Sequence, residues 1–221
     1  MQLSSTKEAV AETQTPSGEG AEGMSREARG SRGVPFAWQI VFGACLVVAV
    51  CLTAAASNEN PYPGRYYLTS VLSGKCLEVA GWDNQEFVAD KQGANVRQWD
   101  YVGGGNQLWE FSPLGGSQFI IYNVYSGMCL EVAGWDNGRF VALDQGANVR
   151  QWEYVGGGNQ HWTIEALSDD RFAIFNAYSG MCLEVAGWDD GEYVVEDQGA
   201  NVRQWEYLET DNQRWTMTLV P

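Results

Sequence analysis

The sequence predicts an all-β domain in which three copies of one unit close around a pseudo-threefold axis. Three observations lead to this prediction: a 53-residue unit occurs three times, its apolar runs are short, and glycine-rich turns separate them. Four short strands in each unit give about twelve strands in total. One such unit cannot bury an apolar centre by itself, whereas three units can share one.

The repeat is clearest around three cysteines, Cys76, Cys129 and Cys182, which are 53 residues apart. The first copy reads CLEVAGWDNQEFVADKQGANVRQWDYVGGGNQLW, and the other two keep the same spacing without an insertion. An open stack of repeats needs terminal repeats with a different outer face. The third copy shows no such cap before Pro221, so we expect a closed ring of units rather than an open array.

Each unit opens on a strand candidate upstream of its cysteine, at residues 66–69, 119–122 and 172–175. Ser-Gly, Gly-Trp-Asp and Gly-Gly-Gly segments divide the rest of the unit, and no stretch is long enough for an amphipathic helix. The predicted domain covers residues 65–221, with repeats at 65–116, 117–169 and 170–221, behind a linker at 57–64.

The residues before the linker divide into two segments. Residues 1–33 are rich in Gly, Ser, Ala, Glu and Thr without apolar periodicity, which predicts a disordered leader. Residues 34–56 are apolar, and their uninterrupted run of 13 residues at 40–52 suits the hydrophobic region of a signal peptide.

Two interpretations of this apolar segment stay open. Arg26, Arg29 and Arg32 precede it and an Ala-Ala-Ala cleavage site stands just before Ser57, as in a secreted protein. Counted over 36–56, the same run is long enough for a signal anchor that tilts in the bilayer. Either interpretation places the C-terminal domain outside the cytoplasm, as a secreted protein or as a single-pass type II membrane protein. A cytosolic protein is the remaining alternative.

The composition argues against several classes of partner. There are 13 Lys and Arg against 28 Asp and Glu, which gives a formal net charge of −15. Nucleic acids, anionic lipids and sulfated or sialylated polymers call for a basic surface, so we expect none of them as a ligand. The single histidine, His161, leaves almost no means of building a metal cluster or a nucleophile–histidine pair.

Each repeat carries an NQxW motif in its last third, at residues 106–109, 159–162 and 212–215, downstream of C-L-acid-V and G-x-x-V-x-x-W. This combination resembles the Q-x-W repeat of ricin B-type lectins, a β-trefoil family that binds sugars. The resemblance covers residues 65–219, roughly 0.7 of the chain, and three motifs in register make it specific. It implies a β-trefoil fold and carbohydrate binding.

The resemblance also implies sugar-contacting residues in each repeat. In the family, a carboxylate after the Cys-Leu step accepts hydrogen bonds from ring hydroxyls, and an aromatic residue at the end of the third strand forms a flat platform. An Asn-Gln pair completes the contacts. The matching residues are Glu78, Trp99, Asn106, Gln107, Glu131, Trp152, Asn159, Gln160, Glu184, Trp205, Asn212 and Gln213.

Several of these residues have a structural interpretation beside the functional one. The tryptophan that ends each NQxW motif is expected in the core, and its glutamine either contacts sugar or ties the turn backbone. Trp99 and its copies either carry the sugar or pack within the fold. The tryptophans of the Gly-Trp-Asp turns are either a second contact surface or a cover for the unit; these are Trp82, Trp135 and Trp188.

The sequence departs from the family pattern in every repeat. Glu stands where the family has Asp, and Arg97, Arg150 and Arg203 stand where it has Gln. The longer carboxylate enters the space of a sugar ring, and an arginine in the same pocket can pair with it. These uniform changes predict an altered specificity or a lost site, and they disfavour galactose. Residues 209–211 replace the Gly-Gly-Gly loop in the third repeat, so its site is expected to differ.

The cysteines depart from the family as well. Relatives often bridge the Cys-Leu cysteine to a second one after the platform strand, where this sequence has Tyr101, Tyr154 and Tyr207. No disulfide within a repeat is then possible. We expect three buried free thiols, with an intermolecular bridge as the lesser alternative.

The threefold repetition argues against an enzyme. Glycoside hydrolysis needs two carboxylates in unlike environments, whereas each carboxylate here has two near-identical copies. Acidic turn residues such as Asp83 and Asp90 lack an EF-hand spacing, so neither a metal nor another cofactor is expected. The sequence predicts a non-catalytic lectin that binds neutral glycans at up to three equivalent sites. The alternatives are a self-associating structural trefoil with degenerate sugar sites and a protein-binding or protease-inhibitor trefoil.

Overall fold

The computed structural model describes residues 59–83, 85–189 and 191–221. The predicted leader at 1–33 and the apolar segment at 34–56 lie outside these residues. Among the residues that are described, no helix has the length and apolar character needed to cross a membrane. The described chain is all-β, as predicted, and its helical pieces are three short 3-10 turns: η1 (Gly105–Gln107), η2 (Gly158–Gln160) and η3 (Asp211–Gln213).

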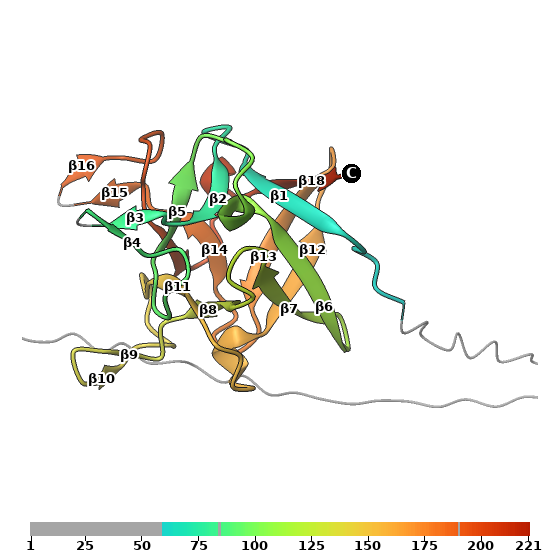
Figure 1. Ribbon diagram of the computed structural model, residues 1–221, viewed down its shortest axis with the longest axis horizontal. Coiled ribbons are helices and arrows are strands. Elements are labelled where there is room, and N and C mark those ends of the chain that lie inside the picture. Colours follow the sequence, from blue (N-terminus) through green and yellow to red (C-terminus); the bar gives the residue numbers. More distant parts are fainter. Residues whose placement is uncertain (1–58, 84, 190) are drawn as a thin grey trace, which may run out of the picture. The chain divides into compact units, whose positions relative to one another are not determined.

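Six strands form a closed antiparallel barrel: β1 (Arg65–Ser70), β6 (Trp109–Gly115), β7 (Gln118–Asn123), β12 (Trp162–Ala166), β13 (Arg171–Asn176) and β18 (Trp215–Val220). β1 pairs with β6 and β18, β7 with β6 and β12, and β13 with β12 and β18. Every strand therefore has two neighbours, and closure removes the exposed edges that an open sheet would leave. These strands lie toward the right in Figure 1.

Three further strand pairs stand beside the barrel: β2 (Cys76–Val79) with β5 (Val96–Trp99), β8 (Cys129–Val132) with β11 (Val149–Trp152), and β14 (Cys182–Val185) with β17 (Val202–Trp205). Together with the barrel they make one sheet of 12 strands. The predicted four strands a repeat are confirmed. The alternation of buried and half-buried residues along Val96–Trp99 sends Val96 and Gln98 inward, while Arg97 and Trp99 face outward.

Each repeat also carries a two-stranded hairpin that the sequence analysis read as a turn. The hairpins are β3 (Trp82–Asp83) with β4 (Glu86–Phe87), β9 (Trp135–Asp136) with β10 (Arg139–Phe140), and β15 (Trp188–Asp189) with β16 (Glu192–Tyr193). Strands of two residues are too short for an alternating pattern to reveal. Figure 1 shows all three hairpins at the end of the domain opposite the barrel strands.

The tryptophan of each NQxW motif lies in the core, as predicted. Trp109, Trp162 and Trp215 are fully buried. Each indole N–H donates to the carbonyl of the leucine in the Cys-Leu step of its own repeat, over 2.9–3.1 Å. The three side chains fill the shared apolar centre of the domain without leaving an indole N–H unpaired.

A buried glutamine joins each repeat to another. Gln98 is fully buried, its Nε2 donates to the carbonyls of Val195 and Asp197 at 2.8 Å each, and its Oε1 accepts from the Ser73 hydroxyl at 2.6 Å. Gln151 and Gln204 repeat this arrangement around the axis. Because Gln98 of the first repeat holds a loop of the third, these bonds close the ring of repeats.

Three asparagines form a second closure on the pseudo-threefold axis. The amide of Asn95 donates to Asn201, that of Asn201 to Asn148, and that of Asn148 to Asn95, each over 2.9 Å. Each side chain is at once donor and acceptor, so the cycle is complete only when all three repeats are present.

The described end of the predicted 57–64 linker packs on the barrel. The ring centroid of Tyr62 lies 5.6 Å from that of Phe111 and 5.5 Å from that of Phe119. The Asn60 side chain donates to the carbonyl of Phe111 over 2.6 Å. The packed domain therefore begins by Asn60, a few residues before the predicted boundary.

The three cysteines of the repeats are free and buried, as predicted. Burial raises the pKa of Cys129 and of Cys182 to about 12, and it raises the pKa of Cys76 in the same direction. These thiols behave as small apolar groups of the core.

Candidate functional site

A shallow cup lies beside the hairpin of the first repeat. Its cavity of about 370 Å³ lies between β3–β4, the end of β5, and the turn that leads into η1. The side chains that line it come from five separate parts of the chain: Glu78, Trp82, Phe87, Arg97, Trp99, Asn106 and Tyr125. The structure thus brings together most of the residues that the sequence predicts for this repeat.

The carboxylate of Glu78 forms the floor of the cup and is fully engaged. Its Oε1 accepts from Arg97, at 3.0 Å from Nε and 2.9 Å from Nη2, and its Oε2 accepts from Gln107 at 3.0 Å. The Glu78 side chain is only 4% exposed. The ion pair considered in the sequence analysis is therefore present, and it occupies the oxygens that were expected to bind sugar hydroxyls.

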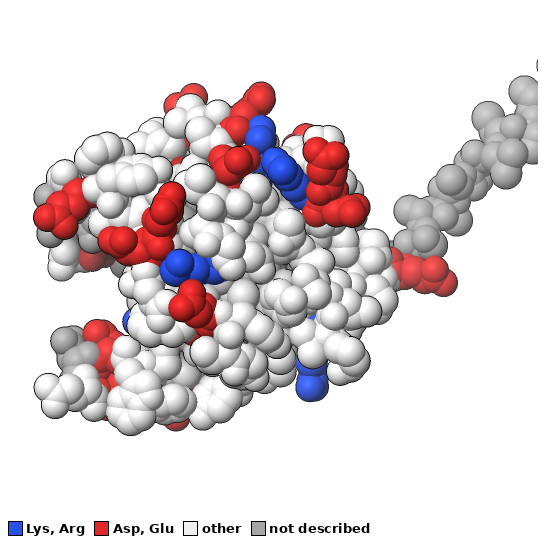
Figure 2. Space-filling model, turned by 90° about the horizontal axis from the view of Figure 1, so that it is seen from above, with Lys and Arg blue, Asp and Glu red and all other residues white. Residues whose placement is uncertain are grey.

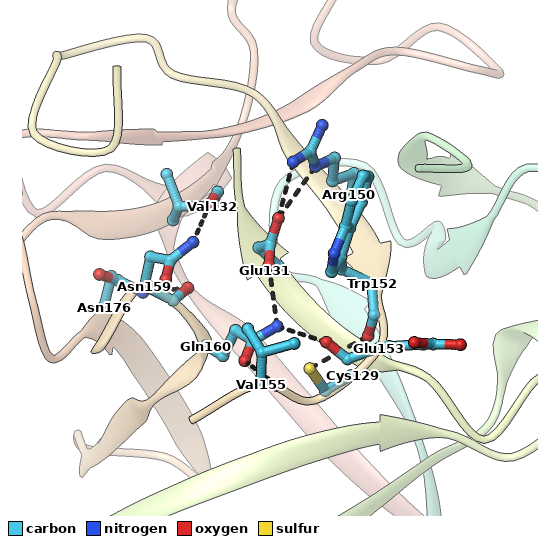
Figure 3. A network of polar contacts seen from close by, with 10 residues as sticks. All are labelled: Cys129, Glu131, Val132, Arg150, Trp152, Glu153, Val155, Asn159, Gln160 and Asn176. Carbon is cyan, nitrogen blue, oxygen red and sulfur yellow. Dashed lines mark hydrogen bonds and ion pairs between the residues drawn. The ribbon is translucent and has the colours of Figure 1, made fainter. Parts of the chain in front are cut away.

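The same network occurs in the other two repeats. Figure 3 shows it around Glu131, which accepts from Arg150 at 2.9 Å and from Gln160 at 2.8 Å. Glu184 accepts from Arg203 at 2.9 Å and from Gln213 at 3.0 Å. Burial raises the pKa of all three glutamates, and the arginine and glutamine partners oppose that rise because they favour the ionised carboxylate.

The glutamine of each NQxW motif serves the turn backbone as well as the carboxylate. Gln107 is fully buried; its Nε2 also donates to the carbonyl of Asp100 at 2.7 Å, and its Oε1 accepts from the Val102 amide at 2.8 Å. Gln160 and Gln213 make the equivalent bonds. These contacts engage both the nitrogen and the oxygen of the side-chain amide. The glutamine therefore holds the turn below the cup.

The guanidinium of each cup lies on the strand tryptophan. The Arg97 Cζ is 4.1 Å from the centroid of the Trp99 ring, and the Arg150–Trp152 and Arg203–Trp205 pairs lie at 4.0 Å. Figure 3 shows Arg150 and Trp152 side by side in the second repeat. A cation over an indole face is stabilised by the ring electrons. One face of Trp99, Trp152 and Trp205 is therefore covered, and their predicted platform role stays a prediction.

The most exposed indoles belong to the hairpins instead. Trp82, Trp135 and Trp188 are 63%, 64% and 62% exposed. Each meets the second aromatic residue of its hairpin edge to face, with centroids 5.4–5.6 Å apart. This packing fixes the ring orientation while leaving the indole open to solvent, which is the geometry of a stacking platform. Of the two roles left open for these residues, the structure favours a contact surface.

The asparagine of the NQxW motif lines the cavity in the first repeat, as Asn106, and in the third, as Asn212. The Asn106 amide donates to the Val79 carbonyl at 2.8 Å, which leaves its Oδ1 available to a ligand. Asn159 and Asn212 donate in the same way to Val132 and Val185.

In the first and third cups one wall comes from a different repeat, and the sequence analysis missed it. Tyr125 of the second repeat closes the first cup, with its ring 5.8 Å from Phe87. Tyr178 stands 6.2 Å from Phe140 in the same relation to the second hairpin, and Leu72 of the first repeat lines the third cup. These three residues occupy equivalent positions, 53 residues apart. The repeat register was the available signal, because it aligns a leucine in the first copy with a tyrosine in each of the other two.

The cavities of the three repeats differ in size and place. The third is the largest, about 640 Å³, and includes Trp188, Arg203, Trp205 and Asn212. In the second repeat a cavity of about 330 Å³ lies on another side of the hairpin, between Trp135, Arg139 and Arg150. Within the described residues no group of three His, Cys, Asp or Glu side chains could hold a metal ion.

This geometry agrees with a family comparison. Residues 64–215 match the ricin-type beta-trefoil lectin domain, more than two thirds of the chain. The chain belongs to this family. Ricin-type domains bind carbohydrate and are generally non-catalytic, so the described part of the chain is a lectin domain. A comparison with curated proteins gave no match.

Solved structures show the same fold. The designed 3-fold symmetric protein ThreeFoil is 34% identical, with a TM-score of 0.58, and the match covers 71% of this chain and 99% of that one. An exo-beta-1,3-galactanase from Clostridium thermocellum is 28% identical, with a TM-score of 0.56, over 73% of this chain and 31% of that one. The Macrolepiota procera ricin B-like lectin, solved with lactose, is 21% identical, with a TM-score of 0.56, over 73% of this chain and 99% of that one.

Proposed function

We propose that this ricin-type domain is a non-catalytic lectin that binds neutral glycans at up to three sites, one beside each hairpin. The observation that carries the proposal is the set of three hairpin tryptophans, each more than 60% exposed and oriented by a second aromatic ring. A flat indole packs against the C–H face of a pyranose, which is the usual means of holding an uncharged sugar.

Within a cup, we assign the exposed indole to stacking and the free Asn106 Oδ1 to a sugar hydroxyl. The Arg97 guanidinium, fixed by Glu78 and Trp99, retains N–H groups directed into the same cup. Glu78 and Gln107 then act indirectly, because they hold Arg97 and the turn in place. The same assignment applies to Trp188, Arg203 and Asn212 of the third repeat, which line one cavity. In the second repeat we assign Trp135 to stacking and Arg150 to a sugar hydroxyl, because these two line the cavity there.

The charge of the domain supports a neutral ligand. The chain carries a formal net charge of −15, and acidic side chains are spread over the face seen in Figure 2, with few basic ones between them. Sulfated and sialylated glycans would be repelled by such a surface. The arginines of the three networks, Arg97, Arg150 and Arg203, do not make the surface basic, because each is paired with a glutamate.

The arrangement of the hairpins supports multivalent binding. All three lie at one end of the domain (Figure 1), so their tryptophans are presented together. Single shallow sugar sites are weak, and simultaneous engagement of several sites on a repetitive glycan raises avidity without a new contact. We also propose that the domain acts outside the cytoplasm, where such glycans are displayed.

A glycan array carrying neutral, sulfated and sialylated glycans tests the proposal. We expect binding to neutral glycans and its loss in the triple variant Trp82→Ala/Trp135→Ala/Trp188→Ala, with the melting temperature retained. A matched control removes exposed apolar side chains outside the cups, in Leu114→Ala/Leu143→Ala/Leu219→Ala. An array without binding, together with polymers in size-exclusion chromatography, would favour the structural assembly module instead.

A further inference from the structure

The three cups differ at the wall that another repeat supplies. In the first cup this wall is Tyr125, and Tyr178 takes the same position beside the second hairpin. In the third cup the position is occupied by Leu72, which has neither an aromatic face nor a hydroxyl. The difference is confined to the junction between the third repeat and the first.

The loop opposite this wall changes together with it. A Cβ atom placed on Gly105 would lie 3.3 Å from the Cβ of Tyr125, and one placed on Gly158 would lie 3.1 Å from the Cδ2 of Tyr178. The third repeat has Asp211 at this loop position, where Leu72 is the wall. A side chain on the loop would therefore crowd the wall residue, and in the second repeat the crowded atom belongs to the tyrosine ring itself.

The loop of the third repeat keeps its turn despite losing its glycines. Glu209 has a φ of 59°, close to the 76° of Gly103 at the equivalent position. This left-handed conformation is unfavourable for a residue with a side chain, and such strain concentrates at functional sites. The loop path is thus retained while its chemistry is replaced.

The result is a larger cup with a polar rim. The third cavity measures about 640 Å³ against about 370 Å³ for the first. Asp211 is held by Arg214 at 3.2 Å and by Arg171 at 3.6 Å, which fixes its carboxylate at the edge. Glu209 and Thr210 line the same cavity with a carboxylate and a hydroxyl.

We infer that the third cup is a distinct subsite that binds two linked sugar rings, whereas the first cup, walled by Tyr125, binds one. The inference rests on the proposed function and adds the length of saccharide that each cup accepts. In the first cup, Trp82 and Tyr125 enclose a space suited to a single pyranose. In the third, the missing tyrosine opens the cavity toward Leu72, and the rim of residues 209–211 offers hydrogen-bond partners to a second ring.

Fluorine NMR of the full chain labelled with 5-fluorotryptophan reads each cup separately. The single variants Trp82→Phe, Trp135→Phe and Trp188→Phe assign the three hairpin signals. The probes are galactose with lactose, N-acetylglucosamine with its β-1,4-linked dimer, and any monosaccharide and disaccharide pair found on the array. We expect the disaccharide to bind about tenfold more tightly than the monosaccharide at Trp188, with less than about a twofold gain at Trp82.

Exchanging the wall and loop residues between the cups provides the control. The variant Leu72→Tyr/Glu209→Gly/Thr210→Gly/Asp211→Gly should lose the disaccharide gain at Trp188. Tyr125→Leu, which removes bulk from the first cup, covers the case in which the fourfold variant fails to fold, and it should raise the disaccharide gain at Trp82. Equal gains at Trp82 and Trp188 would overturn the inference and leave the proposed function standing. If no saccharide moves any of the three signals, the proposed function is overturned and the inference with it.

Discussion

Replacement of Arg97 by methionine tests the network that forms the floor of each cup. The change removes the guanidinium from the Glu78 carboxylate and from the Trp99 ring while keeping the length and apolar character of the stem. Glu78, whose side chain is 4% exposed in the native structure, loses its ionic partner. The variant therefore measures how much unfolding free energy is lost when the buried Glu78 carboxylate has no counter-charge.

The structure sets the expected magnitude. Removing one member of a buried ion pair costs about 3–5 kcal/mol of unfolding free energy. We expect a value near the lower end, about 3 kcal/mol, because Gln107 continues to donate to Oε2 of Glu78 and because the Arg97 side chain is itself 19% exposed. Arg65→Met is the matched control. Its bond to Glu110 is equally short, 3.0 Å, but the side chains are 59% and 49% exposed, so a loss of at most about 1 kcal/mol is expected.

The pH dependence of the deficit follows from the direction of the pKa shift. Burial raises the pKa of Glu78 above its ordinary value of 4.5, and Arg97 opposes the rise. Without Arg97 the folded-state pKa rises further. A carboxyl group with a raised folded-state pKa contributes to the free energy of unfolding. That contribution is fully present below pH 4.5 and is lost as the pH rises through the folded-state pKa. The variant should therefore be more destabilised at pH 7 than at pH 4.5.

Urea unfolding at both pH values measures the effect. The double variant Glu78→Gln/Arg97→Met should recover part of the stability at pH 7, because an amide replaces the buried charge. If Arg97→Met costs no more than Arg65→Met, or if its deficit is the same at both pH values, the floor of the cup does not depend on this ion pair and the reasoning is refuted.

Three further predictions concern the closure and the core. Gln98→Ala should lower the free energy of unfolding in urea by about 3 kcal/mol, because it leaves two buried carbonyls of the third-repeat loop unpaired. The control Gln92→Ala, at an exposed position, should change it by less than about 0.5 kcal/mol. Trp109→Ala should cost about 3–5 kcal/mol through a core cavity, and retention of the wild-type melting temperature would contradict its placement. The three repeat thiols should resist Ellman's reagent at about pH 8 until the protein is unfolded, because burial keeps them protonated. The assay uses a Cys45→Ser/Cys51→Ser background, and rapid reaction of the native protein would disprove the prediction.

Much of the fold was predictable because turn motifs mark the ends of the strands in every repeat. The buried NQxW tryptophans and the four strands a repeat follow from short apolar runs and from the spacing of Cys76 and its copies. The hairpin at Trp82 was not predictable from periodicity, since strands of two residues contain no period. The docking of Tyr62 was missed for a related reason, because a single aromatic residue in a Pro-rich segment shows no pattern.

The site was predictable to the extent that it lies within one repeat. The pairing of Glu78 with Arg97 could be anticipated, because the family resemblance places both residues in one pocket. The structure adds that they are register partners in the antiparallel pair of β2 and β5. Tyr125 and Leu72 could not, because they reach the cup from a neighbouring repeat and only the closed ring brings them there. The axial asparagines, Asn95 with Asn148 and Asn201, depend on closure in the same way.

The most direct test of the account is a crystal structure of the chain with a neutral glycan identified on the array. The account predicts a pyranose stacked on an exposed hairpin indole such as Trp82, in hydrogen-bond reach of Asn106, with the bonds between Glu78 and Arg97 intact. A sugar bound away from all three hairpins, or one that displaces the arginine and binds Glu78 and Trp99 directly, would contradict it.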